Sequence, residues 1–158
     1  MTRPIIKILL FTFILFFNEA FFAQTISSVQ IEGDKNFSVN QYLTWINFTA
    51  GQKYFNGLQD SLGNRILRGL RNEGYFHSAI SRIDTASIDS SNIKIQISVL
   101  EGLPTKINKF IYENSGSDSV FINRVLESAT GIILSQYNID FTFSEILNHF
   151  ENNGYPFA

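Results

Sequence analysis

The feature that most constrains the fold is a strict alternation of apolar and polar residues near the middle of the chain. Branched aliphatic residues occupy every second position of this segment: Ile93, Ile95, Ile97 and Val99. The positions between them are polar: Lys94, Gln96 and Ser98. Because successive side chains of a strand point to opposite faces of the sheet, we predict a strand with one buried and one solvated face. The aliphatic face therefore needs a covering layer from elsewhere in the chain.

Two segments with helical periodicity can supply that layer. From about residue 56 to 72, apolar residues follow i, i+3 and i+4 spacing and share one face: Leu58, Leu62, Ile66, Leu67 and Leu70. Gly74 stands where a glycine commonly ends a helix. Ser38 is a suitable N-cap for an earlier helix that carries Leu43 and Ile46 and ends at Ala50-Gly51.

Two further strands complete the pattern. Val29 and Ile31 alternate with polar residues, and residues 75 to about 84 form the second predicted strand, followed by a polar turn. The order over about residues 26–101 is therefore β-α-α-β-β. We predict an α+β unit whose three-stranded sheet has one face under two helices, with residues 93–99 pointing their aliphatic side chains to those helices.

The same pattern begins again after a short predicted hinge at Glu101-Gly102-Leu103-Pro104. At an offset of 80 residues, glycine and helix positions coincide: Gly51 with Gly131, Ile66-Leu67 with Ile146-Leu147, Asn72 with Asn152, and Gly74-Tyr75 with Gly154-Tyr155. At an offset of 81, Val29 and Ile31 coincide with Phe110 and Tyr112. We predict a first unit over residues 24–102 and a second, incomplete unit over residues 103–158, in which the last strand pair is missing.

The first 23 residues differ from the rest. Arg3 and Lys7 precede a run of apolar residues from 8 to 17, which is shorter than the roughly 20 residues of a spanning helix. This segment is typical of a secretory signal peptide cleaved after Ala23, with an uncleaved membrane anchor as the alternative. Removing it makes the net charge of −2 one unit more negative, which is too mild to indicate a nucleic-acid partner.

Short segments of both units resemble POTRA domains of the outer-membrane barrel-assembly and surface-antigen (D15-like) family. The resemblance covers essentially residues 27–158 and rests on an ordered set of segments: residues 31–38, 51–54, 72–76, 99–102 and 153–158. It implies a row of periplasmic POTRA domains leading to a C-terminal outer-membrane β-barrel. The chain departs from that pattern because nothing after Gly102 has the repeated alternating segments of barrel strands.

The resemblance also implies a function. Such domains receive unfolded outer-membrane or secreted polypeptides and partner subunits by adding a strand to an exposed sheet edge. We therefore expect a periplasmic polypeptide-binding scaffold that is no enzyme and carries no cofactor. An alternative is a POTRA-bearing envelope or division protein that bridges partners without handling clients, although such proteins are usually held by an uncleaved helix and carry one POTRA unit.

The predicted binding edge is the second strand, which the resemblance places at the border of the sheet. Its residues are Tyr75, Phe76, His77, Ser78, Ala79, Ile80, Ser81 and Arg82. Ser78, Ala79 and Ser81 have small side chains and no proline interrupts the segment, while Arg82 and Asp84 limit uncontrolled association. We expect a proline at Ser78 or Ala79, whichever directs its N–H outward, to weaken peptide binding. Tyr75 and Phe76 should face opposite ways, so that one of the two points away from the helices and serves either a domain contact or docking.

Other candidate sites are weaker. Arg65, Arg68 and Arg71 recur every third residue and form either a solvated face or a basic stripe for an acidic partner or lipid headgroups. His77 and His149 have no second ligand at metal spacing, and the chain has no cysteine, so we predict no metal or catalytic role. Asp84 and Asp89 are interpreted as turn carboxylates. Five phenylalanines are predicted core residues of the second unit: Phe110, Phe121, Phe141, Phe143 and Phe150.

Overall fold

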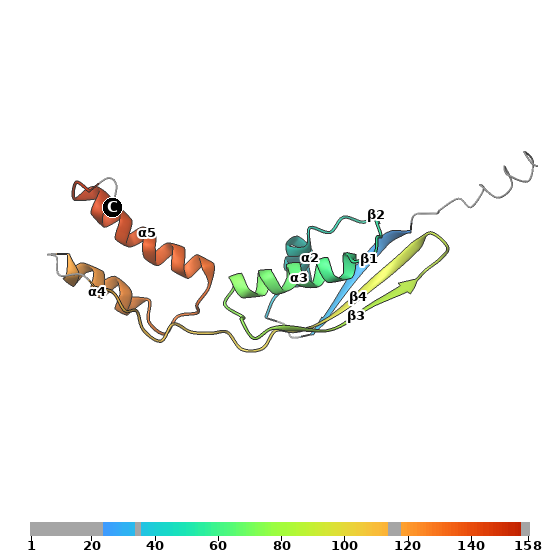
Figure 1. Ribbon diagram of the computed structural model, residues 1–158, viewed down its shortest axis with the longest axis horizontal. Helices are drawn as coiled ribbons and strands as arrows, with labels where there is room; N and C mark the ends of the chain where they lie inside the picture. The colour runs from blue at the N-terminus through green and yellow to red at the C-terminus, as the bar shows by residue number, and fades with distance from the viewer. Residues whose placement is uncertain (1–23, 34–35, 114–117, 156–158) are drawn as a thin grey trace, which may run out of the picture.

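The computed structural model describes residues 24–33, 36–113 and 118–155 (Figure 1). The predicted signal peptide, with its cleavage point after Ala23, lies outside these residues, as do Asp34-Lys35 of the predicted first turn and the last three residues of the chain.

The first part of the chain is an α+β unit with the predicted order of elements. These are β1 (Thr25–Gly33), α2 (Val39–Ile46), β2 (Gln52–Lys53), α3 (Leu58–Asn72), β3 (Ala79–Ser87) and β4 (Asn92–Leu100). The three long strands are those expected from the sequence. The two-residue strand β2, which was not predicted, pairs with the start of β1 and makes the sheet four-stranded, in the order β2-β1-β4-β3.

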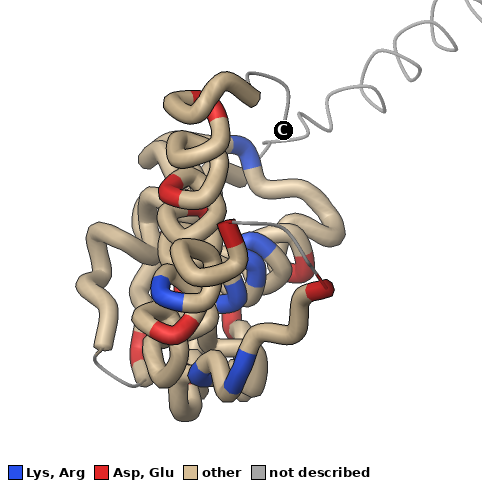
Figure 2. Tube along the Cα trace, turned by 90° about the vertical axis from the view of Figure 1, so that its left-hand side faces the viewer, with Lys and Arg blue, Asp and Glu red and all other residues tan. Residues whose placement is uncertain are grey.

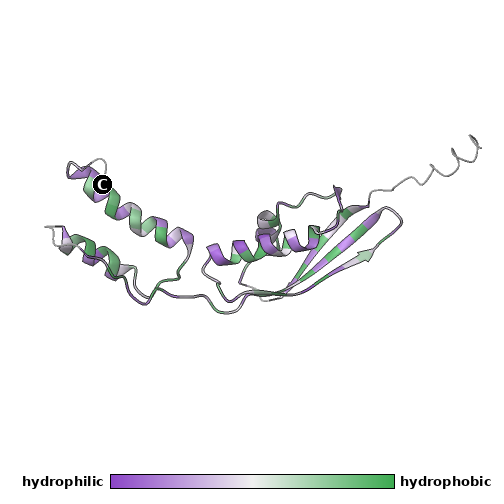
Figure 3. Cartoon of the chain, viewed as in Figure 1, coloured by the Kyte–Doolittle hydropathy of each residue, from purple (hydrophilic) through white to green (hydrophobic). Residues whose placement is uncertain are grey.

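The central position of β4 explains its regular sequence pattern. It runs parallel to β1 and antiparallel to β3, so both of its edges are paired. The four aliphatic residues that begin at Ile93 are at most 3% exposed and face the helices, which confirms the predicted register. Figure 3 shows the resulting alternation as green and purple bands along the strands. Burial of each such side chain contributes about 1.5–3 kcal/mol to folding.

Helix α3 supplies most of the covering layer. Leu58, Leu62, Ile66 and Leu70 are almost completely buried in the core. Leu67, in contrast, is only half buried, because it lies at the border of the apolar face beside β3. The prediction that Leu67 is a full core residue is therefore wrong, although the rest of the stripe is confirmed.

The helix termini follow the local sequence signals. The Ser38 hydroxyl accepts a hydrogen bond from the Gln41 N–H at 3.2 Å, which confirms the predicted N-cap of α2. This helix ends at Ile46 rather than at Ala50-Gly51, since Asn47 adopts the left-handed conformation with φ 51°. At the end of α3, Gly74 has φ 90°, and the Tyr75 N–H donates to the Leu70 carbonyl at 2.9 Å. These are the features of a Schellman C-cap.

An aromatic cluster closes one end of the core. Phe37, Tyr42 and Trp45 pack edge to face, and Tyr75 joins them with its ring centroid 5.1 Å from that of Phe37. The indole of Trp45 lies directly on Gly69, where a Cβ atom would come within 2.3 Å of the ring. The absence of a side chain at Gly69 therefore permits close packing between α3 and α2.

A buried carboxylate ties the end of β4 to the segment before α2. Glu101 is fully buried and accepts hydrogen bonds from the Tyr42 hydroxyl and from both the backbone and side-chain nitrogens of Asn36, at 3.1 and 2.6 Å. Hydrogen bonds to buried polar groups offset the cost of removing them from water. Glu101 is therefore a structural residue rather than part of a flexible hinge.

The second part of the chain repeats the backbone pattern of the first. It contains α4 (Ser119–Ser128), α5 (Gln136–Asn152) and a single β-bridge between Lys106 and Ile133. Several main-chain N–H···O=C hydrogen bonds of the first part recur in the second part, with each residue shifted by 80 or 81 positions. The bond from Tyr54 to Gln24 corresponds to that from Leu134 to Thr105, the bond from Gly51 to Ile26 to that from Gly131 to Ile107, and the bond from Tyr75 to Leu70 to that from Tyr155 to Phe150. The sequence repeat is thus also a repeat of backbone geometry.

The predicted core of the second part is only partly confirmed. Phe110, Phe121 and Phe150 are half buried, whereas Phe141 and Phe143 are 57% and 49% exposed. The prediction that the last two are core residues is wrong in this structure, because no sheet in the described part of the chain covers that side of α5.

Main-chain hydrogen bonds join the two parts. The Thr105 N–H donates to the Gly74 carbonyl at 2.9 Å, and the Thr105 carbonyl accepts from the Leu134 N–H at 2.8 Å. A Cβ atom on Gly74 would lie 2.5 Å from the Ile133 side chain, so glycine is required for this close approach. The segment around Thr105 is therefore held at both sides.

Candidate functional site: the β3 edge and its groove

The candidate site is the open edge of β3, the last strand in the sheet order. Ile88 donates its N–H to the Asn92 carbonyl at 2.8 Å at the closed end of the β3–β4 hairpin. Ile88 and Asn92 are therefore a hydrogen-bonded pair. Hydrogen-bonded and non-hydrogen-bonded pairs alternate along an antiparallel ladder, so Ala86 and Asp84, two and four residues before Ile88, also bond to β4. Ile83, Thr85 and Ser87 then direct their N–H and C=O groups to the open edge. These groups form a template on which another strand can pair.

Two features limit the accessible length of this edge. The pairing register shifts between Ile80 and Arg82, which leaves Ser81 as the extra residue of a bulge, with its hydroxyl bonded to the Ser98 carbonyl. Bulges bend a strand and interrupt regular pairing. On the outer face of the sheet, Arg82 forms an exposed ion pair with Asp84. The freely available part of the edge therefore extends from about Ile83 to Ser87.

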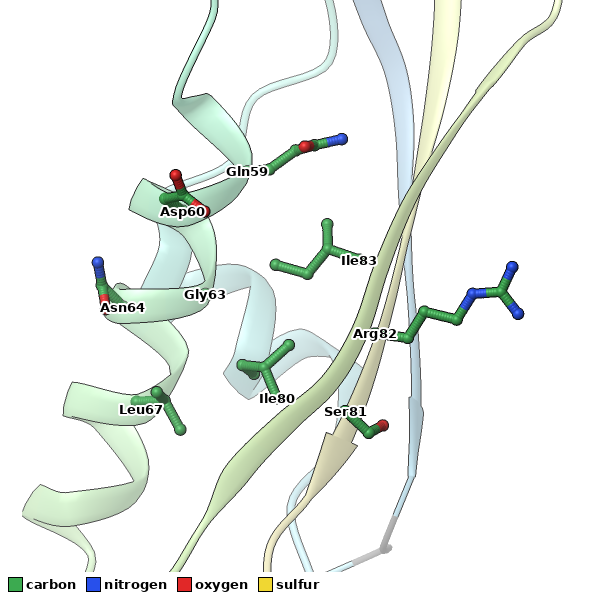
Figure 4. A pocket seen from close by; sticks show the side chains of 9 residues that line it. All are labelled: Gln59, Asp60, Gly63, Asn64, Leu67, Ile80, Ser81, Arg82 and Ile83. Carbon is green, nitrogen blue, oxygen red and sulfur yellow. The ribbon is translucent and has the colours of Figure 1, made fainter.

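A shallow groove of about 650 Å³ runs between β3 and α3 (Figure 4). Ile80 and Ile83 point from the strand toward the helix, and Arg82 points to the opposite side of the sheet. The wall formed by α3 includes Asp60, Gly63 and other residues: Gln59, Asn64 and Leu67. Since Gly63 has no side chain, the helix approaches Ile83 closely, and a Cβ atom at this position would lie 3.2 Å from the Ile83 Cδ1.

The structure divides the predicted edge residues into two groups. Ala79, Ile80, Ser81 and Arg82 belong to β3, but residues 75–78 form a turn before it. Tyr75 is buried in the aromatic cluster and Phe76 is 45% exposed, so the two rings do face opposite ways. The Ser78 N–H is used within the turn, where it donates to the Tyr75 carbonyl at 3.3 Å. The prediction that the strand begins at Tyr75 is therefore wrong.

The position of the edge residues was also misjudged at the other end. The sequence predicts that the strand ends at about Asp84, whereas β3 extends through Ser87. Asp84 lies inside the strand, so its interpretation as a turn carboxylate is wrong. None of the outward-facing residues Ile83, Thr85 and Ser87 was among the predicted site residues, which end at Arg82. The polar composition of residues 84–87 concealed an exposed edge strand, for which period-two hydrophobicity is a weak signal.

The predicted basic stripe is not a continuous free surface. The guanidinium of Arg65 donates to the Ile46 carbonyl at 2.7 Å and so binds the C-terminus of α2, where a cation is favourable. Arg68 and Arg71 remain exposed on α3. Figure 2 shows acidic and basic residues interspersed rather than gathered into one large patch of a single sign.

The pKa values of Tyr75 and Asp89 are shifted by their surroundings. Burial raises the pKa of the Tyr75 hydroxyl, and the nearby carboxylates of Glu101 and Glu73 add to the effect. In the β3–β4 loop, the side chain of Asn92 and the backbone N–H groups of Ser91 and Asn92 bond to Asp89 and lower the pKa of its carboxyl. Asp89 is therefore a turn carboxylate, as predicted, with bonds of 2.8 Å to both backbone groups.

The histidines occupy different environments. His77 is exposed, whereas His149 stacks on Phe121 and lies 3.0 Å from the Asp118 carboxylate, which connects the C-terminal end of α5 to the start of α4. Among the residues that the structure describes, no three potential ligands are grouped to hold a metal ion. None of the described helices is long and apolar enough to cross a membrane.

The fold and the edge define a class of molecule: a small α+β unit with an open strand beside a helix. Comparison with known proteins gives structural similarities at low identity. One is to POTRA domains 3–5 of BamA from Haemophilus influenzae, with 14% identity and a TM-score of 0.47, covering 84% of this chain and 51% of that chain. The chain thus spans about half the length of that structure.

Two further solved structures are similar to the chain. POTRA domains 1–2 of the periplasmic domain of Omp85 from Anabaena match with 15% identity and a TM-score of 0.39, over 84% of this chain and 81% of theirs. CdiB from Escherichia coli matches with 12% identity and a TM-score of 0.38, over 79% of this chain and 22% of its own. No protein-family model and no curated protein match the chain.

Proposed function

We propose that the chain is part of a periplasmic scaffold that receives extended polypeptides in outer-membrane protein assembly or secretion. The observation that carries this proposal is the outward-facing backbone of Ile83, Thr85 and Ser87 beside a groove with both apolar and polar walls. An added strand would gain main-chain hydrogen bonds from the edge and apolar contacts from the groove, which is how strand addition combines affinity with selectivity.

The proposal includes the organisation of the protein. The repeated hydrogen bonds support two POTRA-like units, over residues 24–102 and 103–158, preceded by a signal peptide at residues 1–23. In a protein of this type the units lie in the periplasm, and a C-terminal barrel of the full-length protein anchors them in the outer membrane. The partners are unfolded outer-membrane or secreted polypeptides and assembly subunits. The work of the chain is binding rather than catalysis, and it needs no cofactor.

A proline scan of β3 tests the proposal. Thr85→Pro removes an outward N–H and places a ring on the open edge, so binding of an extended outer-membrane-protein peptide should weaken about ten-fold. Thr85→Val keeps the N–H and should bind like the wild type. Titration calorimetry measures the affinity, and circular dichroism verifies that each variant is folded.

A matched control tests the assignment of the edge itself. The N–H of Asp84 faces β4, so Asp84→Pro should break the ladder and lower the thermal midpoint, whereas Thr85→Pro should preserve the fold. A folded Thr85→Pro protein that binds the peptide with unchanged affinity would move the binding site away from β3.

A further inference from the structure

A stripe of residues along α3, part of which lines the groove beside β3, has a charge of opposite sign at each end. Asp60, Asn64, Leu67 and Arg71 follow i, i+4, i+3 and i+4 spacing, so they form one stripe along α3. Asp60, Asn64 and Leu67 line the groove, and Arg71 continues the stripe beyond it. Both charged side chains are exposed, and within the described part of the chain neither has a hydrogen bond or an ion pair. Asp60 and Arg71 are therefore available to a bound partner.

The direction of α3 relative to β3 fixes which charge lies at which end. Gly63 contacts Ile83 more closely than Ile80, and Leu67, which follows Gly63 in the helix, lies beside Ile80 in Figure 4. The helix and the strand are therefore antiparallel. Asp60 lies toward the Thr85 end of the edge, and Arg71 toward its Ala79 end.

We propose that this pair of charges selects the direction and sequence of the bound strand, an inference that rests on the proposed function. An added strand that runs antiparallel to β3 pairs with the edge from Ser87 to Ile83, and its C-terminal continuation then follows the groove past the bulge toward the Ala79 end. Its N-terminal part then lies near the carboxylate of Asp60 and its C-terminal part near the guanidinium of Arg71. The favoured client is an extended segment with a basic residue before, and an acidic residue after, an apolar stretch.

The dimensions of the elements set the spacing of these charges. Asp60 and Arg71 are 11 residues apart in a helix, or about 16 Å along its axis. This length corresponds to about five residues of a strand. Because only alternate side chains face the groove, the client charges should fall four or six residues apart, with apolar side chains between them over Ile80 and Ile83.

Two peptides of identical composition test the inference. One carries lysine at position 1, leucine at positions 3 and 5 and glutamate at position 7, with threonine between, and the other exchanges the lysine and the glutamate. We expect the lysine-first peptide to bind about ten-fold more tightly, because two attractive surface contacts replace two repulsive ones. The preference should shrink at high salt, where exposed charges are screened.

A charge exchange in the protein provides the matched control. The double variant Asp60→Lys with Arg71→Glu keeps the net charge, and it should reverse the preference so that the glutamate-first peptide binds more tightly. Arg68→Glu changes a neighbouring exposed arginine outside the stripe and should leave the order of affinities unchanged. Circular dichroism confirms that the variants are folded.

The outcomes separate this inference from the proposed function. If both peptides bind the wild-type chain equally, or if the charge exchange does not reverse their order, the selection of direction is wrong although strand addition stands. A glutamate-first preference in the wild type also overturns it. If neither peptide binds at any salt concentration, the proposed function itself fails.

Discussion

At the scale of single residues, side chains on one helix face differ in how much they contribute to stability. Ile66 and Leu70 are completely buried, whereas Leu67 is half buried beside the groove. We expect Ile66→Ala and Leu70→Ala each to lower the free energy of unfolding by about 2–5 kcal/mol. Leu67→Ala should lower the free energy of unfolding by clearly less, since removing this partly exposed side chain leaves a space that water can fill. Urea unfolding measures the three values, and equal losses would contradict the assignment of Leu67 to the border.

Gly69 is a second sensitive position. Its hydrogen atoms leave room for the Trp45 ring, and an alanine there would require the indole to move. We expect Gly69→Ala to destabilise the protein by about 1–3 kcal/mol, the usual cost of overpacking, although alanine favours helix more than glycine does. Thermal unfolding measures the change. As a control, Asn64→Ala on the exposed side of α3 should change stability by only about 0.5 kcal/mol or less. A neutral or stabilising Gly69→Ala would show that the helix contact is looser than described.

Glu101 shows how a buried polar group acts through its partners. Replacing it with alanine leaves the Tyr42 hydroxyl and the Asn36 nitrogens without their acceptor. We expect Glu101→Ala to lower the free energy of unfolding by about 1–3 kcal/mol, because the hydrogen bonds to this buried carboxylate are lost. Glu101→Gln keeps an acceptor oxygen and should be milder. Chemical unfolding of both variants compares them, and a harmless Glu101→Ala would mean that water satisfies these donors.

At the scale of elements, the β3–β4 hairpin has a pH-dependent loop. Because the folded protein lowers the pKa of Asp89, the ionised form stabilises the loop. This contribution is complete above the unfolded value of about 4, and it is lost as the pH falls through the lowered pKa. The wild type should therefore be more stable than Asp89→Ala at pH 7, and the difference should shrink below pH 4. Thermal unfolding at several pH values measures it, with Asp84→Ala as the control.

Elements whose sequence pattern follows from burial were predictable, and those shaped by their neighbours were not. The aliphatic alternation of β4 arises because the strand is central and one face is covered, so its position and register were correct. The edge strand β3 has little buried surface, and its ends were placed four residues early at the start and several residues early at the finish. The two-residue strand β2 carries no periodic signal, since its hydrogen bonds depend only on the tertiary position of β1.

The candidate site was also only partly predictable from the sequence. The family resemblance placed the second long strand at the border of the sheet, but which of its residues face outward depends on the alternation of hydrogen-bonded pairs. Sequence alone does not specify that alternation. Arg65 illustrates the opposite error, because a regular spacing of arginines suggested a surface stripe while its guanidinium binds the end of α2.

At the scale of the whole molecule, Thr105 determines how firmly the two parts are joined. Thr105→Pro removes the N–H that bonds to the Gly74 carbonyl. We expect this variant to retain its helical content but to be cleaved faster by proteases in the segment between Gly102 and Lys109. Limited proteolysis followed by mass spectrometry measures the rate. Thr105→Val keeps the N–H and serves as the control. Equal cleavage rates would show that the side chains, rather than this bond, hold the joint.

The hydrogen bonds between the two parts belong to the peptide backbone, and this has a consequence for how such chains diverge. Apart from the small size required of Gly74, no side chain supplies a donor or acceptor to the bonds made by Thr105. Substitutions can accumulate along residues 103–109 without removing these bonds, provided that proline does not enter at Thr105. Two descendants of such a chain could therefore share almost no residues at this junction and still hold their neighbouring units at the same angle.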